Sequence, residues 1–373
     1  EIELHVELTA NPITNENVFK TANVTITATD TDAGIDASKT YKYYLSTSAT
    51  ALQNTASGTF NFSTEGDVHS KEQSFTIGEN ITDTRYLFIE NIYDKAGNVT
   101  IKPETQITLN GTTQAQAIDN VTIDGVTYHV FGLNTDPYKI DNSAPSVTIT
   151  TSDTGEDWSR THTAQVEIVD VGLAGVDTST FKYIWVNEES LTAEQKALSE
   201  ATFTDRWNDA IAKESADGVD NLYGTFTNAS TTITTPTDNG TEVISGPDWY
   251  LWILAKDKLG NTVVVKSTQV HLDNEIPKFE LTPSSGGIAK TMQVKITAIE
   301  QKSGLAETNM QQYYLSTSNT ALEGGEWLDY ESGIEETIGA GKNGTYYLYV
   351  KQLKDKAGNE SNIIGDVVTR QDE

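Results

Sequence analysis

Three five-residue blocks of nearly the same sequence recur along the chain, and each follows a run of aromatic and aliphatic residues. The blocks are Asp94-Lys95-Ala96-Gly97-Asn98, Asp257-Lys258-Leu259-Gly260-Asn261 and Asp355-Lys356-Ala357-Gly358-Asn359. The hydrophobic runs before them are residues 86–89, 249–253 and 346–350. A fixed order of short motifs is the signature of a repeat architecture, so the chain is predicted to contain diverged copies of one structural unit.

Alternation of apolar and polar residues predicts the structure of that unit. Residues 23–29 place Val24, Ile26 and Ala28 on one face, and residues 293–298 repeat the pattern. A period of two residues with one polar face is typical of antiparallel strands. Short strands separated by turns favour a β-sandwich. We expect its core to include Leu45, Leu87, Ile89, Ile184, Ile253, Leu315, Leu348 and Val350.

Two further motifs divide the chain. Residues 43–48 and 313–318 are both Tyr-Tyr-Leu-Ser-Thr-Ser, and Asp-Asn-x-x-Pro occurs at 141–145 and 273–277. Because Pro ends strands and stiffens linkers, the second motif is predicted to join neighbouring units. The predicted repeats are 1–142, with an extra hairpin near 101–135; 143–274, with an insertion near 187–245; and 275–373. We expect the hairpin to turn at Asp124-Gly125, and the insertion to hold helices over 190–198 and 204–212.

In this order, the motifs resemble the immunoglobulin-like repeats of large bacterial surface proteins and adhesins. The resemblance covers essentially the whole chain. It implies one β-sandwich per repeat, display outside the cell at the surface or in the cell wall, and a stalk or adhesive role. The partners it implies are neighbouring repeats and a host or cell-surface glycan or protein. Both ends of the chain lie close to the linker register, so we expect a longer array.

Composition and motifs disfavour several other classes of protein. The chain has 54 acidic and 25 basic residues, a net charge of −29, so nucleic-acid binding is not expected. It contains no run of 18 apolar residues, so this segment is not expected to insert into a membrane. The chain has no Cys, and its five His residues form no metal or catalytic motif. We therefore expect no catalytic residues and a non-enzymatic role.

Acidic residues from three separate segments are predicted to meet at each junction between repeats. In an immunoglobulin-like sandwich the B–C and F–G loops lie at the end where the chain enters. The linker, B–C loop and F–G loop then supply Asp141, Asp170 and Asp257 at one junction, and Asp273, Glu300 and Asp355 at the next. We expect the loop after Asp170 to be one residue shorter than its counterparts.

Two interpretations of these acidic residues remain open. Crowded carboxylates repel one another unless a cation neutralises them, and Ca²⁺ prefers six to eight oxygen ligands. Asn142 and Asn274 would add amide oxygens, and the linkers resemble the calcium-binding junctions of cadherins. In the first repeat Asp30, Asp32 and Asp94 would form an incomplete site. Alternatively, the aspartates only close Asx turns and cap backbone N–H groups. No other cofactor is expected.

A second class of function is recognition of a glycan or protein through the insertion of the second repeat. Trp158, Trp207 and Trp327 lie in polar or variable segments and are the candidate stacking platforms. A third alternative is a subunit of an S-layer or filament. Asn-x-Ser/Thr sequences such as 80–82 suggest glycosylation, and intramolecular isopeptide bonds are a further hypothesis.

Overall fold

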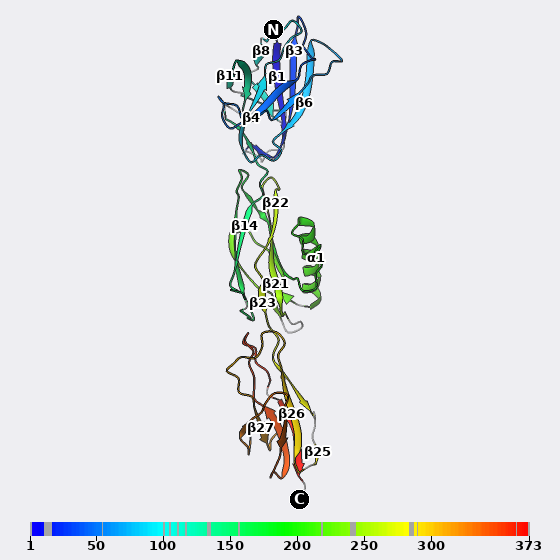
Figure 1. The fold of residues 1–373 in the computed structure, drawn as a ribbon, viewed down its shortest axis with the longest axis vertical. Helices are drawn as coiled ribbons and strands as arrows, with labels where there is room; N and C mark the ends of the chain where they lie inside the picture. Colours follow the sequence, from blue (N-terminus) through cyan, green and yellow to red (C-terminus); the bar gives the residue numbers. More distant parts are fainter. Residues whose placement is uncertain are drawn as a thin grey trace. The chain divides into compact units, whose positions relative to one another are not determined.

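The chain is an all-β protein whose strands form several sheets. The computed structural model describes residues 2–10, 17–53, 55–99, 101–103, 106–109, 112–115, 118–132, 136–155, 157–217, 219–238, 244–282, 287–288, 290–362 and 364–371. Among them, one α-helix occurs, α1 (Glu200–Asp217), and it lies in the insertion of the second repeat. The fold class predicted from the alternation is therefore confirmed (Figure 1).

Strands between residues 2 and 140 form two sheets. One has the order β10-β9-β1-β3-β6 with β8 beside β1, and consists of β1 (Ile2–Ala10), β3 (Ala22–Asp30), β6 (Ser70–Ile77), β8 (Ile101–Pro103), β9 (Gln106–Leu109) and β10 (Thr112–Ala115). The other has the order β11-β12-β7-β13-β2 with β4 beside β7 and β5, and consists of β2 (Val18–Phe19), β4 (Tyr41–Ser46), β5 (Gly58–Phe60), β7 (Asp83–Glu90), β11 (Ile118–Ile123), β12 (Val126–Phe131) and β13 (Tyr138–Ile140).

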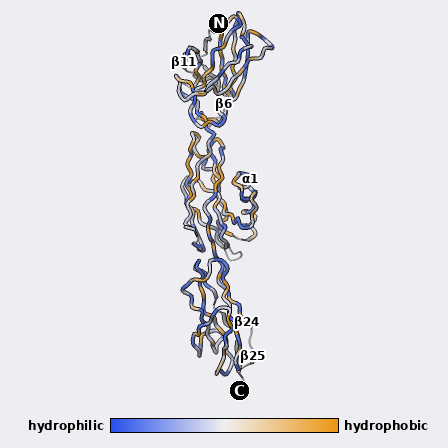
Figure 2. The backbone as a smooth tube through the Cα atoms, in the orientation of Figure 1, coloured by the Kyte–Doolittle hydropathy of each residue, from blue (hydrophilic) through white to orange (hydrophobic). Residues whose placement is uncertain are grey.

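The first core lies between these two sheets. Alternate residues of β1 and β3 are buried, and the antiparallel register places Val6 opposite Ile26. They belong to one cluster with Leu45 of β4 and Leu87 of β7 in the other sheet. The alternation of hydrophobic and hydrophilic residues along the strands is visible in Figure 2. Burial of one face of each sheet against the other is what stabilises a sandwich.

The predicted hairpin is present between β11 and β12. Asp124 and Gly125 form its turn with φ of 51° and 80°. Positive φ at both central residues is the type I′ geometry that Asp-Gly favours, because it matches the twist of the paired strands.

The remaining strands form sheets whose members fall within 146–272 or within 278–371. In the first range the orders are β14-β15-β19, β18-β16-β21-β22 with β23 beside β21, and β17-β20, with β14 (Ser146–Thr151), β15 (Thr163–Val169), β16 (Val176–Asn187), β17 (Val219–Asp220), β18 (Tyr223–Thr225), β19 (Ser230–Thr234), β20 (Thr237–Asp238), β21 (Gly246–Asp257), β22 (Thr262–Lys266) and β23 (Val270–Leu272). In the second they are β24-β26-β29 and β25-β31-β30-β27-β28, with β24 (Lys278–Thr282), β25 (Gly287–Ile288), β26 (Met292–Ile299), β27 (Gln312–Ser316), β28 (Trp327–Asp329), β29 (Glu335–Ile338), β30 (Gly344–Val350) and β31 (Ile364–Gln371).

All eight residues predicted for the cores are buried, with exposed fractions of 5% or less. In the last range, Val294 and Ile296 of β26 pack in one cluster with Leu315, Leu348 and Val350 of the facing sheet. The aromatic runs before the repeated blocks thus supply inner-face residues, as the sequence predicts.

The insertion contains one of the two predicted helices. The prediction over 204–212 corresponds to α1, whose first turn is capped by Ser199, where Oγ accepts a hydrogen bond from Thr202 N at 3.1 Å. The prediction of a helix over 190–198 was wrong, since this segment forms turns. Thr192 and Gln195 make reciprocal capping contacts there, but the segment ends at Ser199, where the cap of α1 begins.

When residues are grouped by their contacts in space, the chain divides into two compact units, and these units do not follow the predicted repeats. One comprises Glu1–Val147, Ile168–Phe181 and Ala255–Val263, and the other Thr148–Glu167, Lys182–Leu254 and Val264–Glu373. The first unit thus adds two loops from the second repeat to the residues of the first. The boundaries at 142 and 274 stay a prediction.

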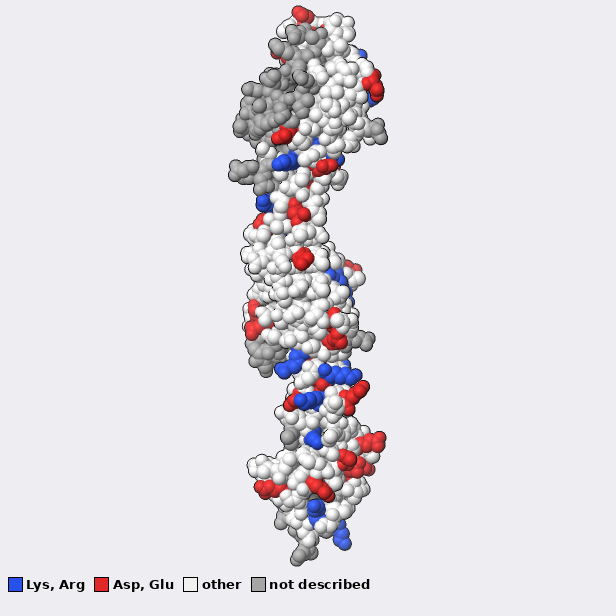
Figure 3. Space-filling view, turned by 90° about the vertical axis from the view of Figure 1, so that its left-hand side faces the viewer, with Lys and Arg blue, Asp and Glu red and all other residues white. Residues whose placement is uncertain are grey.

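Charged residues of both signs share the surface. On the face drawn in Figure 3, Lys and Arg side chains lie among Asp and Glu side chains, and most of the surface is uncharged. Among the described residues, no helix has both the length and the apolar character needed to cross a bilayer.

Candidate functional site

Each Asp-Lys-x-Gly-Asn block forms a turn closed by its own aspartate. After β21, Asp257 Oδ1 accepts hydrogen bonds from the backbone N–H groups of Leu259 (2.9 Å) and Asn261 (2.8 Å), and Oδ2 accepts one from Asn261 Nδ2 (2.6 Å). Gly260 has φ of 78°, which favours glycine. The same pair of bonds from Asn N and Nδ2 joins Asn98 to Asp94 and Asn359 to Asp355. These are the contacts that the turn interpretation predicts.

The B–C loop of each repeat contacts this turn at the same point. The backbone N–H groups of Lys95, Lys258 and Lys356 donate to the carbonyl oxygens of Gly34, Gly175 and Gly304, each at 2.9 Å. These three glycines have φ of 76°, 75° and 80°. Because Gly175 occupies the place of Gly34 and Gly304, the loop after Asp170 is one residue longer than its counterparts. The expectation of a shorter loop was therefore wrong.

The linker carboxylate of Asp141 reaches into this longer loop. Its Oδ2 accepts hydrogen bonds from the backbone N–H groups of Leu173 (2.6 Å) and Ala174 (2.7 Å), and Oδ1 accepts one from Ser143 (2.9 Å). Asp141 is fully buried. Three N–H donors thus stabilise a charge that would otherwise be costly to remove from water.

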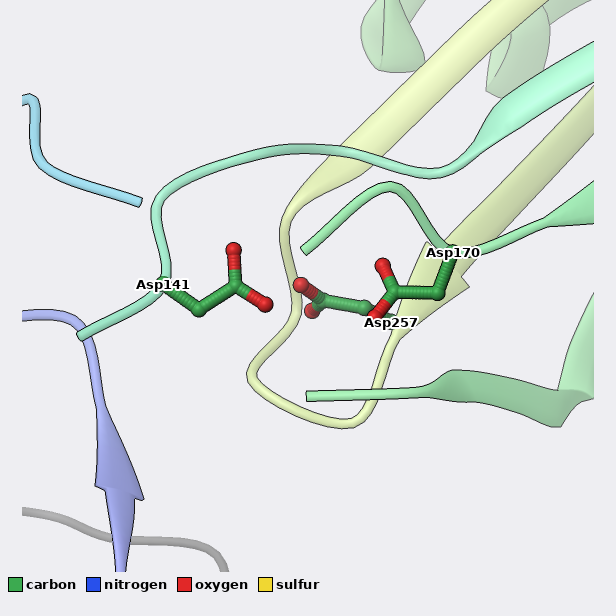
Figure 4. A group of neighbouring side chains, drawn as sticks. All are labelled: Asp141, Asp170 and Asp257. Carbon is green, nitrogen blue, oxygen red and sulfur yellow. The ribbon is translucent and has the colours of Figure 1, made fainter. Parts of the chain in front are cut away.

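Asp141, Asp170 and Asp257 come from the three predicted segments and meet in one cluster (Figure 4). One oxygen of each lies within 4.8 Å of the others. Asp170 Oδ2 accepts a hydrogen bond from Gly175 N at 2.7 Å, whereas its Oδ1 is buried and has no hydrogen-bond partner. Three close carboxylates with an unpartnered oxygen are an arrangement to which a cation would add favourable charge.

A second cluster of the same kind consists of Asp273, Glu300 and Asp355, again within 4.8 Å. Asp273 Oδ2 accepts a hydrogen bond from Ser303 N (3.1 Å), and Glu300 Oε1 accepts one from Lys302 N (2.7 Å). The hydroxyl oxygen of Ser303 is buried without a hydrogen-bond partner. The two clusters therefore share both the order of their segments and the presence of an unsatisfied oxygen.

The electrostatics of the second cluster oppose ionisation of Glu300. Burial raises the pKa of the Glu300 carboxyl, and the charges of Asp273, Asp355 and Glu275 raise it further, while the bond from Lys302 N lowers it. A glutamate with a raised pKa binds a proton more readily in the folded state than in the unfolded chain, so the environment of Glu300 opposes its negative charge. A bound cation would lower this pKa again.

The side-chain amide nitrogens of Asn142 and Asn274 contact residues that precede the linkers, and the role predicted for their amide oxygens stays a prediction. Asn142 Nδ2 donates to the carbonyl oxygens of Lys20 (3.1 Å), Gly78 (2.8 Å) and Ile81 (2.8 Å), all of which precede the linker. Asn274 Nδ2 likewise donates to the carbonyl oxygen of Ile244 at 2.9 Å. In each Asp-Asn pair, the aspartate binds the loop that follows and the asparagine binds the loops before it.

In the described part of the chain, the acidic residues predicted to meet in the first repeat do not form a cluster like the two above. Asp30 and Asp94 are buried, and Asp32 is exposed. Asp30 Oδ2 accepts a hydrogen bond from Gly34 N at 2.8 Å, and the side chain of Asn98 lowers the pKa of Asp94. Within the described residues these three aspartates do not form a group like the other two.

Trp158, Trp207 and Trp327 lie in three separate places, and each is half-buried against other rings or a lysine. The ring of Trp158 lies 5.3 Å from that of His271. Trp207 on α1 packs on Tyr223 (5.0 Å), and Trp327 packs on Tyr314 (5.5 Å). The structure therefore does not bring the three together into one surface.

Sequence reasoning missed three contributors to the first cluster. Leu173 and Ala174 act through backbone N–H groups, which leave no sequence signal. Asn261 Nδ2 also approaches the carbonyl oxygen of Asp141 at 3.3 Å, and Asn359 Nδ2 contacts that of Asp273 at 2.9 Å. All three repeated blocks end in asparagine, and this was the sequence signal from which the contact could have been predicted.

Gly172 provides a direct test of the packing around Asp141. A Cβ atom at this position would collide with both carboxylate oxygens of Asp141. We expect Gly172→Ala to lower the free energy of unfolding by about 2 kcal/mol, since overpacking a tight site has costs of this size. Calorimetry of the full chain measures the effect, and the exposed neighbour Val171→Ala is the control. Equal transition temperatures for the two variants would contradict the described position of Asp141.

Comparisons with known proteins give structural similarities only. No protein-family model and no curated protein sequence matches the chain. Similar solved structures include fibronectin domains FN1–FN3 of chicken CNTN1 (11% identity, 99% of both chains, TM-score 0.25) and the Escherichia coli adhesin FdeC (12% identity, 99% of this chain and 97% of that one, TM-score 0.27). Three N-terminal domains of the bacteriophage RB49 outer capsid protein Hoc are also similar (7% identity, 99% of both chains, TM-score 0.28). With TM-scores this low, the architecture rests on the sheets described above.

Proposed function

We propose that this chain is a non-enzymatic segment of an extracellular bacterial surface protein, in which immunoglobulin-like repeats form a stalk stiffened by Ca²⁺ at the linkers. The observation that carries the proposal is that the same arrangement of residues recurs in both linkers. At each of two junctions, an Asp-Asn pair lies between loops, and the aspartate joins two further acidic residues.

The hydrogen bonds of the linker support a mechanical role. Asn142 is held by three carbonyl oxygens on one side, and Asp141 is held by Leu173 and Ala174 on the other. Bending the linker would break several of these bonds at once, and each bond to the charged Asp141 contributes about 1.5–3 kcal/mol. A joint of this kind resists rotation better than a flexible tether, which suits a stalk.

The donor set of both clusters fits Ca²⁺. Carboxylate oxygens are hard ligands, and Ca²⁺ accepts irregular geometry from loops together with water. Asp141, Asp170 and Asp257 would hold the ion at one junction; Asp273, Glu300 and Asp355 would hold it at the other. Existing N–H bonds occupy part of each carboxylate, so the unpartnered Asp170 Oδ1 and the destabilised charge of Glu300 are the strongest reasons to expect binding.

Calcium is expected to raise the thermal stability of the full chain. A ligand at 100 times its Kd adds about 2.7 kcal/mol to the unfolding free energy of the folded state that binds it. Calorimetry in Ca²⁺ and in a chelator measures the shift, and titration calorimetry gives the stoichiometry. The double variant Asp170→Asn/Glu300→Gln removes one charge from each cluster and should abolish the shift.

Asp32→Asn is the matched control, because this acidic side chain is exposed in the incomplete site of the first repeat. It should retain the calcium response. Identical melting curves with Ca²⁺ and with chelator, together with no heat of binding, would reject the calcium sites and leave the hydrogen-bonded linker. Small-angle scattering of the full chain tests the stalk itself. A chain with flexible linkers would give the scattering profile of a flexible particle and would contradict a stiff stalk.

A further inference from the structure

A cavity of about 370 Å³ lies in the insertion of the second repeat, beside α1. Trp185, Asn187 and Glu189, at and just beyond the end of β16, line it together with Trp249 of β21 and Arg206 of α1. Its volume is in the range of pockets that hold small molecules. None of the residues that line the cavity belongs to the acidic clusters, and the proposed stalk function does not use it.

One face of α1 turns charged residues towards this cavity. Arg206, Asp209, Ala210 and Lys213 follow the i, i+3, i+4, i+7 spacing of a single helix face, and all four line the cavity. Ile211, on another face, is 38% exposed. Phe203 and Ala210 of α1 are buried and hold the helix in place, so the three charged residues beside them are available for a binding role.

Two buried N–H donors on residues of the cavity wall have no acceptor. They are Trp249 Nε1 and Arg206 Nε. Trp249 is only 4% exposed, so its N–H is removed from solvent. By contrast, Trp185 Nε1 donates to the carbonyl oxygen of Thr234 at 2.9 Å. An unpaired buried donor costs about 1–3 kcal/mol, and an oxygen atom of a ligand would recover this energy.

Two hydrogen-bond donors and one acceptor lie close together near Gly246, the first residue of β21. Asn187 Nδ2, Trp249 Nε1 and Glu189 Oε2 lie 3.1, 3.7 and 3.8 Å from the position that a Cβ atom would take on Gly246. Gly246 has φ of 146°, which favours glycine, so the space beside these three atoms stays clear of a side chain. A ligand group beside Gly246 would lie near the N–H donors of Asn187 and Trp249 and near the carboxylate of Glu189, and all three of these residues line the cavity.

The positive and negative side chains that line the cavity are equal in number. Arg206 and Lys213 are opposed by Asp209 and Glu189, and Arg206 Nη2 forms an ion pair with Asp209 Oδ2 at 3.1 Å. A net-neutral wall favours a neutral ligand. Hydroxyl groups both donate and accept hydrogen bonds, as this mixed wall requires.

We propose that this cavity binds a neutral sugar, either a free monosaccharide or the end of a neutral glycan. Ligand-observed NMR with the full chain tests the proposal, using D-glucose, D-galactose, D-mannose and N-acetyl-D-glucosamine at up to about 10 mM, which detects a Kd near 1 mM. N-acetylneuraminic acid, D-glucuronic acid and glycine serve as charged probes. At least one neutral sugar should bind more tightly than every charged probe.

Two variants connect binding to the unpaired donors. Trp249→Phe keeps an aromatic ring and removes the N–H, and Arg206→Lys keeps the charge and removes Nε–H. Each should weaken sugar binding by about tenfold, because a net hydrogen bond contributes roughly 1 kcal/mol or somewhat more. Trp207→Phe, on the same helix but packed on Tyr223, is the matched control and should bind normally.

The melting temperature separates a loss of binding from a loss of structure. Trp249→Phe should melt at the same temperature as the parent or higher, because it removes an unsatisfied buried group. No binding of any neutral sugar would overturn the proposal, as would tighter binding of a charged probe. Sugar binding that survives both Trp249→Phe and Arg206→Lys would place the site elsewhere and also overturn it.

Discussion

Replacement of Asp257 by alanine should lower the free energy of unfolding by about 4 kcal/mol. The carboxylate accepts three hydrogen bonds, two from the backbone N–H groups of Leu259 and Asn261 and one from Asn261 Nδ2. Loss of an acceptor costs about 1–3 kcal/mol for each donor left unpaired. The corresponding calorimetric transition of the full chain measures the loss.

Asp257→Asn separates the charge of this residue from its hydrogen bonds. Asparagine keeps one acceptor oxygen, so its destabilisation in the presence of chelator should be about half that of alanine. Asp177→Ala is the control, since this aspartate also accepts bonds from Ser179 N and Oγ, but these bonds are exposed to solvent at the start of β16. Equal losses for Asp257→Ala and Asp177→Ala would contradict the importance assigned to the buried turn.

The second large effect is a loss of stability in weak acid caused by His129. Its ring is buried on β12, where Nε2 lies 2.9 Å from Asn91 Oδ1 and Nδ1 has no hydrogen-bond partner. Burial lowers the pKa of His129 from 6.5 to about 4. Protonation would place a charge on a buried nitrogen that lacks an acceptor, so the folded state holds the neutral ring.

The sign of the pH dependence follows from this difference. The unfolded chain takes up the proton near pH 6.5, whereas the folded chain resists it until about pH 4. The neutral ring of His129 therefore makes its full contribution to the free energy of unfolding above pH 6.5. This contribution falls as the pH drops towards 4, by about 3 kcal/mol in total. Between pH 7.5 and 5 the expected loss is about 2 kcal/mol.

His129→Gln should remove this component, because the amide does not titrate. The difference in unfolding free energy between the parent and His129→Gln should shrink as the pH falls from 7.5 to 5, where most carboxylates remain ionised. His69→Gln, at an exposed position, controls for loss of a histidine. A difference that stays constant over this interval would show that the ring is protonated or solvated in the folded state.

Much of the fold could be predicted because its signals are local. Alternation identified β3 and β26, Asp124-Gly125 identified a hairpin, and the Asp-Lys-x-Gly-Asn blocks identified turns. The acidic clusters were predictable for a related reason. Once the turns and linkers of a sandwich are placed, topology alone brings Asp141, Asp170 and Asp257 to the same end.

The features that could not be predicted depend on contacts distant in sequence. Asn142 Nδ2 donates to the carbonyl oxygens of Lys20, Gly78 and Ile81, which lie between 61 and 122 residues away in the sequence. The cavity beside α1 requires Trp185 and Trp249 to meet one face of that helix, and no periodicity in the sequence reports how a helix packs. Gly172 and Gly175 look equivalent in the sequence, and only the bond from Lys258 distinguishes them.

The position of Asp141 has a consequence for how this polypeptide can be cut. The predicted boundary of the first repeat lies at residue 142, yet the carboxylate of Asp141 accepts hydrogen bonds from the backbone N–H groups of Leu173 and Ala174, about 30 residues beyond it. A fragment expressed from residue 143 onwards would begin with those two amides unsatisfied and with its entrance loop unsupported. The predicted repeat and the residues that support its entrance loop are thus offset by two residues, so a fragment meant to keep this loop intact should include Asp141.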